Sequence, residues 1–239
     1  MPNCPLSAPA LRNQFLARLP KDYLCRLSPL LQPVELKVDQ VLYQSYGPIE
    51  YAYFPTGAVL SALVVMQDGG TIEVATVGCE GLVGHYGFGG ETSPHRVIAQ
   101  IGGDGYRLPA RVLQEEANQG HALSSLLAAY HIAFMAQVSQ SVACNGLHGL
   151  EQRCCRWLLM SRDRVQSDHL RLSQEYLAAM LGARRASVTD ALKPLQEAGL
   201  VSSRRGVIRV LDGAGLEARA CECYAIVRDR YAELLGNAL

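Results

Sequence analysis

The sequence lacks an excess of charge of either sign and lacks a long apolar run. Its 22 Lys and Arg residues balance 22 Asp and Glu residues, so the overall charge indicates no particular partner. No apolar run reaches the roughly 18 residues of a membrane helix, because Ser, Tyr and His interrupt the longest candidate, around Leu123–Met135. The first residues, Met1-Pro-Asn-Cys-Pro, do not resemble a secretory signal. We therefore expect a cytoplasmic protein with no membrane partner.

Paired cysteines and enzyme motifs are missing as well. The eight cysteines, at 4, 25, 79, 144, 154, 155, 221 and 223, form no Cys-x-x-Cys pair, which predicts reduced thiols. Those in helical stretches, Cys154–Cys155, Cys221 and Cys223, are expected to be small buried side chains, with a redox switch as the alternative. No metal site is predicted. The sequence has no Walker loop, His-Glu-x-x-His, Gly-x-Ser-x-Gly or dinucleotide fingerprint, and 87–90 (GFGG) is interpreted as a turn, so no enzyme is expected.

Charge is present, but it is distributed unevenly. Residues 1–150 carry 8 Lys and Arg against 11 Asp and Glu, a net −3, whereas residues 151–239 carry 14 against 11, a net +3. A chain of 239 residues is long enough for two domains of about 120 residues. The C-terminal part is therefore where a polyanion is expected to bind.

Residues 1–110 are predicted to form a β domain. Short alternating apolar runs recur about every ten residues, which is typical of a sandwich, roll or barrel. The runs are Val34–Val38, Val41–Tyr43, Ile49–Phe54, Val59–Met66, Thr71–Val77, Arg96–Ile101 and Tyr106–Leu108. Asp68-Gly69 is the strongest hairpin signal, and Gly102-Gly-Asp-Gly is interpreted as a turn.

Residues 111–146 change to a helical period. Apolar residues recur every three or four positions and form one stripe on a long helix. The stripe Leu127, Tyr130, Phe134 and Val138 is predicted to be the interface of a homodimer. The alternative is a helix that lies on its own β domain.

Residues 147–239 are predicted to form a winged helix-turn-helix. Helices are expected over Leu150–Val165, Ser173–Leu181, Arg184–Ala198 and Leu216–Leu235. Ser173 caps a short helix, Gly182 provides a tight turn, and the next helix has a polar forward face, which is helix-turn-helix spacing. A hairpin turning at Arg205-Gly206 follows as a basic wing. Residues 184–209 hold six basic and two acidic residues, which favours DNA over the alternative of a helical hairpin with a solvated arginine face.

Residues 172–201 (LSQEYLAAMLGARRASVTDALKPLQEAGLV) resemble the winged helix of CRP/FNR-type bacterial transcription regulators. The order of parts, from about residue 30 to 211, is similar too. The resemblance implies an α+β fold with an N-terminal β-roll like a cyclic-nucleotide-binding domain, a long dimerisation helix and a C-terminal winged helix-turn-helix. It also implies a cytoplasmic homodimer that binds a two-fold symmetric DNA site, responds to a signal through the β-roll and has RNA polymerase as a partner.

The recognition helix departs from the family pattern. Well-studied members carry Glu and, four residues later, Arg, but this chain has Ala186 and Asp190 there. Neither can make the usual contacts to a G·C pair. Base reading is therefore assigned to Arg185, Ser187 and Thr189, and phosphate contact to Arg184. The full set of predicted DNA-binding residues is Ser173, Arg184, Arg185, Ser187, Thr189, Arg204 and Arg205.

The effector cassette departs from the family pattern as well. Cyclic-nucleotide binders place a Glu directly after the segment that Leu82-Val-Gly84 matches, but this chain has His85 there. The candidate phosphate ligand Arg96 is followed by Val97, where these binders have Ser or Ala. A neutral imidazole is a poor acceptor for two ribose hydroxyls, so cyclic AMP is disfavoured. Gly84, His85, Arg96 and Val97 remain the candidate effector pocket. The alternative role for Arg96 is an ion pair with Glu80 or Glu91.

Metal cofactors of related sensors match the sequence poorly. Only Cys4 and Cys25 lie near the N-terminus, too few for an iron–sulfur centre. His85 and Pro2 leave haem as a lesser alternative, although the offset differs from that of the carbon monoxide sensor. The sequence thus predicts a homodimeric transcription regulator whose effector is unknown. The alternative is a haem- or nucleotide-binding β-roll module with a different output.

Overall fold

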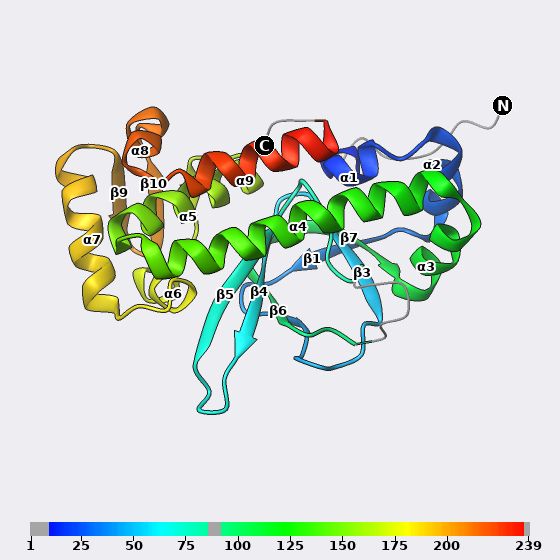
Figure 1. Ribbon diagram of the computed structural model, residues 1–239, viewed down its shortest axis with the longest axis horizontal. Helices are drawn as coiled ribbons and strands as arrows, with labels where there is room; N and C mark the ends of the chain where they lie inside the picture. The colour runs from blue at the N-terminus through cyan, green and yellow to red at the C-terminus, as the bar shows by residue number, and fades with distance from the viewer. Residues whose placement is uncertain (1–9, 86–91, 237–239) are drawn as a thin grey trace.

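The structure is a computed structural model that describes residues 10–85 and 92–236 (Figure 1). It has the predicted order of a β-roll, a long helix and a winged helix-turn-helix. From residue 10 onward, four short helical segments precede the roll: η1 (Ala10–Arg12), α1 (Gln14–Ala17), α2 (Lys21–Leu27) and η2 (Ser28–Leu30). Phe15 and Leu16 of α1 are completely buried against the roll, so this leading segment is part of the core.

In the described part of the chain, seven strands form the β-roll as two antiparallel sheets. They are β1 (Gln32–Leu36), β2 (Val41–Tyr43), β3 (Tyr51–Pro55), β4 (Val59–Val65), β5 (Thr71–Val77), β6 (Arg96–Ile101) and β7 (Gly103–Pro109). The sheet orders are β1-β7-β3 and β2-β6-β4-β5. The predicted hairpin between β4 and β5 is confirmed: Gly69 has a φ of 85°, and the Asp68 side chain accepts a hydrogen bond from the Gly70 N–H at 2.9 Å.

The interpretation of Gly102-Gly-Asp-Gly as a turn is wrong. Strand β7 begins at Gly103 and pairs with both β1 and β3. A Cβ atom at Gly103 would lie 2.6 Å from the backbone carbonyl of Gly57. The glycine is needed for a close approach of two backbones, not for a reversal of the chain.

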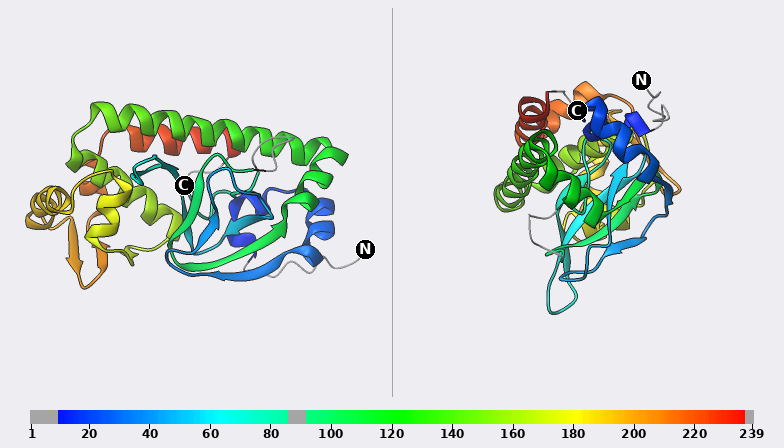
Figure 2. Two further views of the ribbon diagram at one scale, coloured as in Figure 1. Left: turned by 90° about the horizontal axis from the view of Figure 1, so that it is seen from below. Right: turned by 90° about the vertical axis from the view of Figure 1, so that its right-hand side faces the viewer.

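The predicted helix over 111–146 consists of two helices, α3 (Ala110–Gln119) and α4 (His121–Leu147). Gly120 separates them in an extended conformation, and a Cβ there would overlap the Tyr23 hydroxyl. A contact to α2, far away in the sequence, therefore places the break. Helix α4 runs along the length of the molecule, over the roll and the C-terminal region (Figure 2).

The predicted dimer stripe on α4 mostly faces inward. Tyr130 and Phe134 are 0% and 1% exposed, and the Tyr130 hydroxyl donates to the Leu82 carbonyl at 3.0 Å. Leu127 and Val138 are half-buried; Leu127 packs on the apolar cluster that contains Tyr130, and Val138 on the one that contains Phe134. Because their side chains are covered by their own chain, the prediction that Tyr130 and Phe134 contact a second copy is wrong. The alternative, a helix lying on its own β domain, describes this stripe.

The opposite face of α4 is solvent-exposed and partly apolar. It is lined at steps of three and four by Ser125, Ala128, Ile132, Met135, Ser139, Val142 and Gly146. Helix α4 also meets the length and composition of a membrane span, with a mean hydropathy of 1.3 over 18 residues. The helix extends past the run ending at Met135, and it contains no Asp, Glu, Lys or Arg, although His121, Tyr130 and His131 lie in it. One helix with this length and composition does not establish a membrane span, because core helices of soluble proteins have them too. Helix α4 packs on the β-roll.

The C-terminal region is mostly helical. Its elements are α5 (Leu150–Val165), β8 (His169–Leu170), α6 (Gln174–Met180), α7 (Arg185–Glu197), β9 (Val201–Arg204), β10 (Val207–Val210), α8 (Gly213–Arg219) and α9 (Cys223–Leu235). The single helix predicted over Leu216–Leu235 is wrong. The backbone is extended at Ala220, with a ψ of 160°, and the chain turns there so that α9 can lie along α4 (Figure 1).

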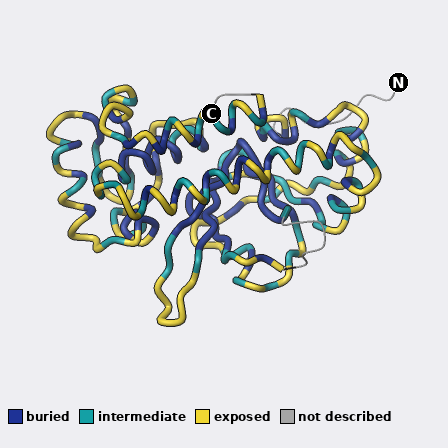
Figure 3. Tube along the Cα trace, in the orientation of Figure 1, coloured by how far each residue is buried: buried dark blue, intermediate teal, exposed yellow. Residues whose placement is uncertain are grey.

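Buried polar contacts join α5 to the β-roll. The Arg164 guanidinium lies 2.9 Å from the Glu80 carboxylate and donates to the Gln137 side chain at 3.0 Å. Nearby, the indole N–H of Trp157 donates to Glu73 at 3.0 Å. The residues that make these contacts are all buried, and Figure 3 shows buried backbone in the middle of the molecule, between the roll and the C-terminal region. We call these residues, Glu73, Glu80, Gln137, Trp157 and Arg164, the junction.

Candidate nucleic-acid interface

Helices α6 and α7 form the predicted helix-turn-helix. Ser173 is the N-cap of α6, and its hydroxyl accepts a hydrogen bond from the Tyr176 N–H at 3.1 Å. Gly182 has a φ of 59°, the left-handed conformation expected at the tight turn. Leu177 and Val188 are completely buried between the two helices and α5. The inward side of the motif therefore fixes which side of α7 faces solvent.

The outward side of α7 presents unpaired cations. Arg184 is the N-cap and Arg185 the first residue of the helix, and both are exposed, as are Ser187 and Thr189. Within residues 10–85 and 92–236, no ion pair involves Arg184 or Arg185. A guanidinium without an internal carboxylate is available to phosphate oxygens or to a guanine edge.

Thr189 is tied to its neighbours instead. Its hydroxyl donates to the Gln174 side chain at 2.8 Å, and the Gln174 amide donates to the Ser203 hydroxyl at 3.1 Å. This chain of contacts links α7, α6 and the wing. The sequence analysis did not predict a role for Gln174 or Ser203. The one feature of the sequence that pointed to Gln174 is its polar amide directly after the N-cap Ser173.

The wing has the predicted turn. Strands β9 and β10 are joined by Arg205 and Gly206, whose φ angles of 47° and 76° are both positive. Two residues with positive φ are typical of a type I′ turn. Arg204 and Arg205 are exposed at the tip, and neither belongs to an ion pair in the described part of the chain. The interface therefore has two separate cationic parts, the start of α7 and the wing tip.

The four candidate effector residues do not converge. Gly84 and His85 line a cavity of about 320 Å³ between the roll, α3 and α4. Its lining is Gly84, His85, Ala110, Leu113, Gln114, Ala117, Leu127, Ala128, His131 and Ile132. Arg96 and Val97 lie on β6 and are not among these lining residues. The alternative partner Glu80 contacts Arg164 instead, while Pro2, Cys4, residues 87–90 and Glu91 lie outside the described residues.

The cavity offers little to an anionic ligand. Its described lining has no Lys or Arg. Burial and, to a smaller extent, the nearby His131 together lower the pKa of His85 to about 3. His85 is therefore a neutral imidazole at physiological pH. Its ring lies against those of Tyr130 and Phe134, with centroids 4.7 and 5.7 Å away.

Comparisons with known proteins agree with this geometry. Residues 152–219 match the model of the Crp-like helix-turn-helix domain. The chain carries a Crp-like helix-turn-helix domain on a CRP/FNR-type fold. The matched residues include Ser173, the arginines of α7 and the wing, so this part of the predicted DNA-binding surface lies within a DNA-binding domain. No curated protein sequence matches the chain.

Solved structures share the CRP/FNR-type fold over most of the chain. FixK2 from Bradyrhizobium japonicum aligns with a TM-score of 0.68 at 17% identity, covering 80% of this chain and 98% of that one. The CRP-family regulator TTHB099 from Thermus thermophilus aligns with a TM-score of 0.65 at 20% identity, covering 78% of this chain and 96% of that one. The c-di-GMP-responsive regulator CLP from Xanthomonas campestris aligns with a TM-score of 0.59 at 14% identity, covering 85% of this chain and 99% of that one. At these identities the likeness shows a common fold.

Proposed function

We propose that the protein is a cytoplasmic, homodimeric transcription regulator that binds a two-fold symmetric DNA site. The observation that carries the proposal is the pair of cationic parts, Arg184 and Arg185 at the start of α7 and Arg204 and Arg205 at the wing tip. All four are exposed, on a scaffold that is otherwise closely packed. The start of a recognition helix reads base edges, and a wing holds the phosphate backbone. RNA polymerase is the expected protein partner of such a regulator.

The exposed face of α4 is the proposed dimer interface. Its residues repeat at steps of three and four, which is the heptad spacing of a helix that packs on a copy of itself. Ile132, Met135 and Val142 are 50%, 45% and 65% exposed in the single chain. Small residues at Ser125, Ala128, Ser139 and Gly146 would allow two helices to approach closely. This face replaces the inward stripe as the candidate interface.

The cavity beside His85 is the proposed signal site. A volume of about 320 Å³ is at the small end of ligand pockets, and its apolar lining favours a small, uncharged molecule over cyclic AMP. Ala128 and Ile132 line the cavity and also belong to the exposed face of α4. A ligand there would contact the helix through which two copies pair.

DNA recognition is tested by selecting binding sites from a randomised duplex library with the purified full-length chain. We expect enrichment of one palindromic sequence bound by two chains per duplex. Fluorescence anisotropy on that duplex and on a scrambled one gives the specificity ratio, which is about 10³ or more for specific regulators. Equal affinity for both duplexes would favour the alternative, a ligand-binding module with another output.

The dimer interface is tested by placing two negative charges on the exposed face of α4 and, separately, away from it. Met135→Glu with Val142→Glu is expected to give a folded monomer in sedimentation equilibrium that loses specific DNA binding. Gln119→Glu with Ala122→Glu, at exposed positions that do not belong to this face, is the control and should stay dimeric. A dimer that survives the first pair would place the interface elsewhere.

The signal site is tested with cyclic AMP and with the purified protein as isolated. Millimolar cyclic AMP is expected to leave the melting temperature unchanged, whereas a ligand at 100 times its dissociation constant adds about 2.7 kcal/mol to the free energy of unfolding. A clear upward shift would contradict the assignment. Visible absorption typical of haem would support the haem alternative instead.

A further inference from the structure

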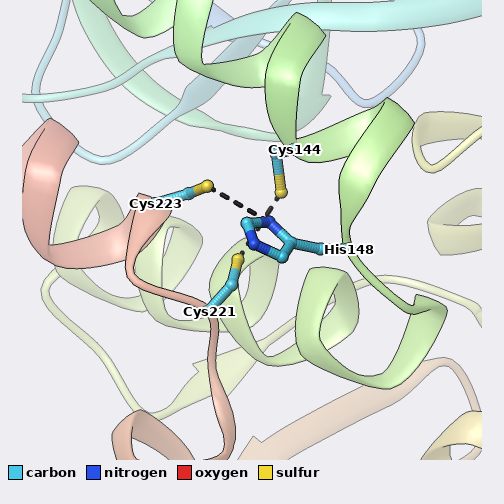
Figure 4. A group of neighbouring side chains, drawn as sticks. All are labelled: Cys144, His148, Cys221 and Cys223. Atoms are coloured by element: carbon cyan, nitrogen blue, oxygen red, sulfur yellow. Dashed lines mark hydrogen bonds between the residues drawn. The ribbon is translucent and has the colours of Figure 1, made fainter.

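Four side chains with metal-binding atoms meet at the C-terminal end of α4. Cys144 and His148 are four residues apart, so they lie on one side of the helix. Cys221 and Cys223 lie on either side of Glu222, where the chain passes from α8 to α9. Figure 4 shows the three thiols and the imidazole directed toward one another. The thiol sulfurs and one ring nitrogen all lie within 4.8 Å of each other.

The distances fit a tetrahedron. The sulfurs of Cys144 and Cys221 are 3.5 Å apart, and the sulfur of Cys223 is 3.4 Å from Nδ1 of His148. Zinc bonds of about 2.3 Å to sulfur and 2.0–2.1 Å to nitrogen at tetrahedral angles place neighbouring ligand atoms about 3.5–3.8 Å apart. The four groups thus need only small movements to coordinate one ion.

The surroundings already orient the ligands. Nε2 of His148 lies 3.3 Å from the Glu222 carboxylate, which leaves Nδ1 directed toward the sulfurs. The Gln140 amide donates to the Cys223 sulfur at 3.0 Å. A carboxylate behind a histidine ligand and a hydrogen bond to a ligand sulfur are typical of contacts that support a metal site.

The environment also suits the charge of a filled site. All three cysteines are buried and the His148 side chain is 18% exposed, so the three sulfur ligands are shielded from solvent. Three thiolates and one Zn²⁺ carry a net charge of −1, by −3 plus +2. The guanidinium groups of Arg153 and Arg156 interact electrostatically with Cys144 and would offset that charge.

We propose that Cys144, His148, Cys221 and Cys223 bind one Zn²⁺ ion, which fixes the start of α9 to the end of α4. Thiolate and imidazole ligands select zinc among the common divalent ions, and four protein ligands in a closed tetrahedron are typical of a structural rather than a catalytic site. A Cys144–Cys221 disulfide would use two of the four groups and leave the convergence of His148 and Cys223 without a role. The proposal is independent of the proposed function.

The site is tested by measuring zinc and by cobalt substitution in the full-length chain. Protein purified under reducing conditions is expected to contain one zinc per chain by mass spectrometry of the metal. Co²⁺ added to the stripped protein should give the visible absorption of tetrahedral cobalt and a thiolate-to-cobalt charge-transfer band. Cys221→Ser and Cys223→Ser should lose both signals, whereas Cys25→Ser and Cys155→Ser, which lie outside the cluster, should keep them.

Two further variants separate metal loss from misfolding. His148→Cys should still bind metal, with a cobalt spectrum shifted toward four sulfur ligands, and Glu222→Gln should weaken zinc affinity about 10-fold. Circular dichroism checks that each variant is folded. A folded, fully reduced chain that gives no cobalt bands overturns the proposal. So does a Cys144–Cys221 disulfide in the purified protein whose reduction restores no metal binding.

Discussion

Arginine has opposite environments at the junction and at the DNA-binding face. The Arg164 side chain is 0% exposed and pairs with Glu80, which is 1% exposed. Arg184, Arg185, Arg204 and Arg205 are exposed and belong to no ion pair in the described ranges. A buried guanidinium must be neutralised by its own chain, whereas an exposed one remains free for an external anion. The first kind holds the winged helix against the roll, and the second is available to DNA.

Removal of Arg164 should have the largest effect. Burial lowers the pKa of Arg164, but the charges of Glu80, Tyr231 and Asp163 outweigh it, and the pKa is raised overall. Arg164→Met leaves Glu80 buried without its partner, and we expect a loss of about 3–5 kcal/mol in the free energy of unfolding by urea.

Two companion variants decide whether the buried charge is the cause. Arg164→Met with Glu80→Leu should recover much of the loss, because neither charge then remains in the core. Arg162→Met breaks the exposed pair with Asp168 and should cost no more than about 1 kcal/mol. If the double variant is as unstable as the single one, packing of the Arg164 stem, not charge, holds the junction.

The other junction carboxyl, Glu73, should make stability depend on pH. Burial raises its pKa to about 7, against the opposing effects of Ser61, Arg156, Trp157 and Arg164. A raised pKa means that folding favours the protonated acid. The stabilising contribution of Glu73 to the free energy of unfolding is therefore complete below about pH 4.5 and is lost as the pH rises through 7. The total loss is about 3 kcal/mol.

Glu73→Gln should remove this dependence. The variant should match the parent near pH 4.5 and be more stable at pH 8, as measured by urea unfolding. Trp157 is the single tryptophan and donates to Glu73, so its fluorescence should titrate near pH 7 in the parent and stay flat in the variant. A parent whose tryptophan emission does not change between pH 5 and 8 would show that Glu73 keeps one charge state.

At the DNA-binding face, Arg185 should have the largest effect. It is the first residue of α7, where a guanidinium can reach the O6 and N7 atoms of guanine. Arg185→Ala should cost about 1–3 kcal/mol of binding free energy on the selected duplex and relax the preference at one base pair per half-site. Arg111→Ala, an exposed arginine on α3, is the control. Equal losses on specific and scrambled duplexes would assign base reading to Arg184 or Ser187 instead.

The two regions also differ in how far the sequence predicts them. The bounds of α5 and the Arg205-Gly206 turn follow from local chemistry, namely helical periodicity and a residue pair suited to positive φ, and the structure confirms both. The break at Gly120 depends on Tyr23, and the inward direction of Tyr130 depends on Leu82 and Phe15. Such contacts join residues about 50 or more positions apart, so periodicity alone cannot reveal them.

The same limit explains the other missed features. An apolar stripe on a helix predicts that something covers it, but not whether the cover is the same chain or a copy. Cys144 and Cys221 are 77 positions apart, and only the i, i+4 spacing of Cys144 and His148 and the Cys221-x-Cys223 pair hinted at a cluster. The sequence also did not show that the candidate effector residues are divided between two places: His85 faces α4, whereas Arg96 lies on β6 and is not among the residues that line the cavity.

The smallest effects are expected at the wing tip, where Arg204 and Arg205 should hold phosphates without reading bases. Arg204→Ala and Arg205→Asn should each weaken binding to specific and scrambled duplexes by the same factor. Asparagine suits position 205 because it tolerates the positive φ found there. Removing one arginine–phosphate interaction reduces the slope of log affinity against log salt by about one unit. Anisotropy titrations at several salt concentrations measure that slope. A wing variant that loses affinity only on the specific duplex would mean that the wing reads DNA sequence, and the division between a reading helix and a holding wing would then be wrong.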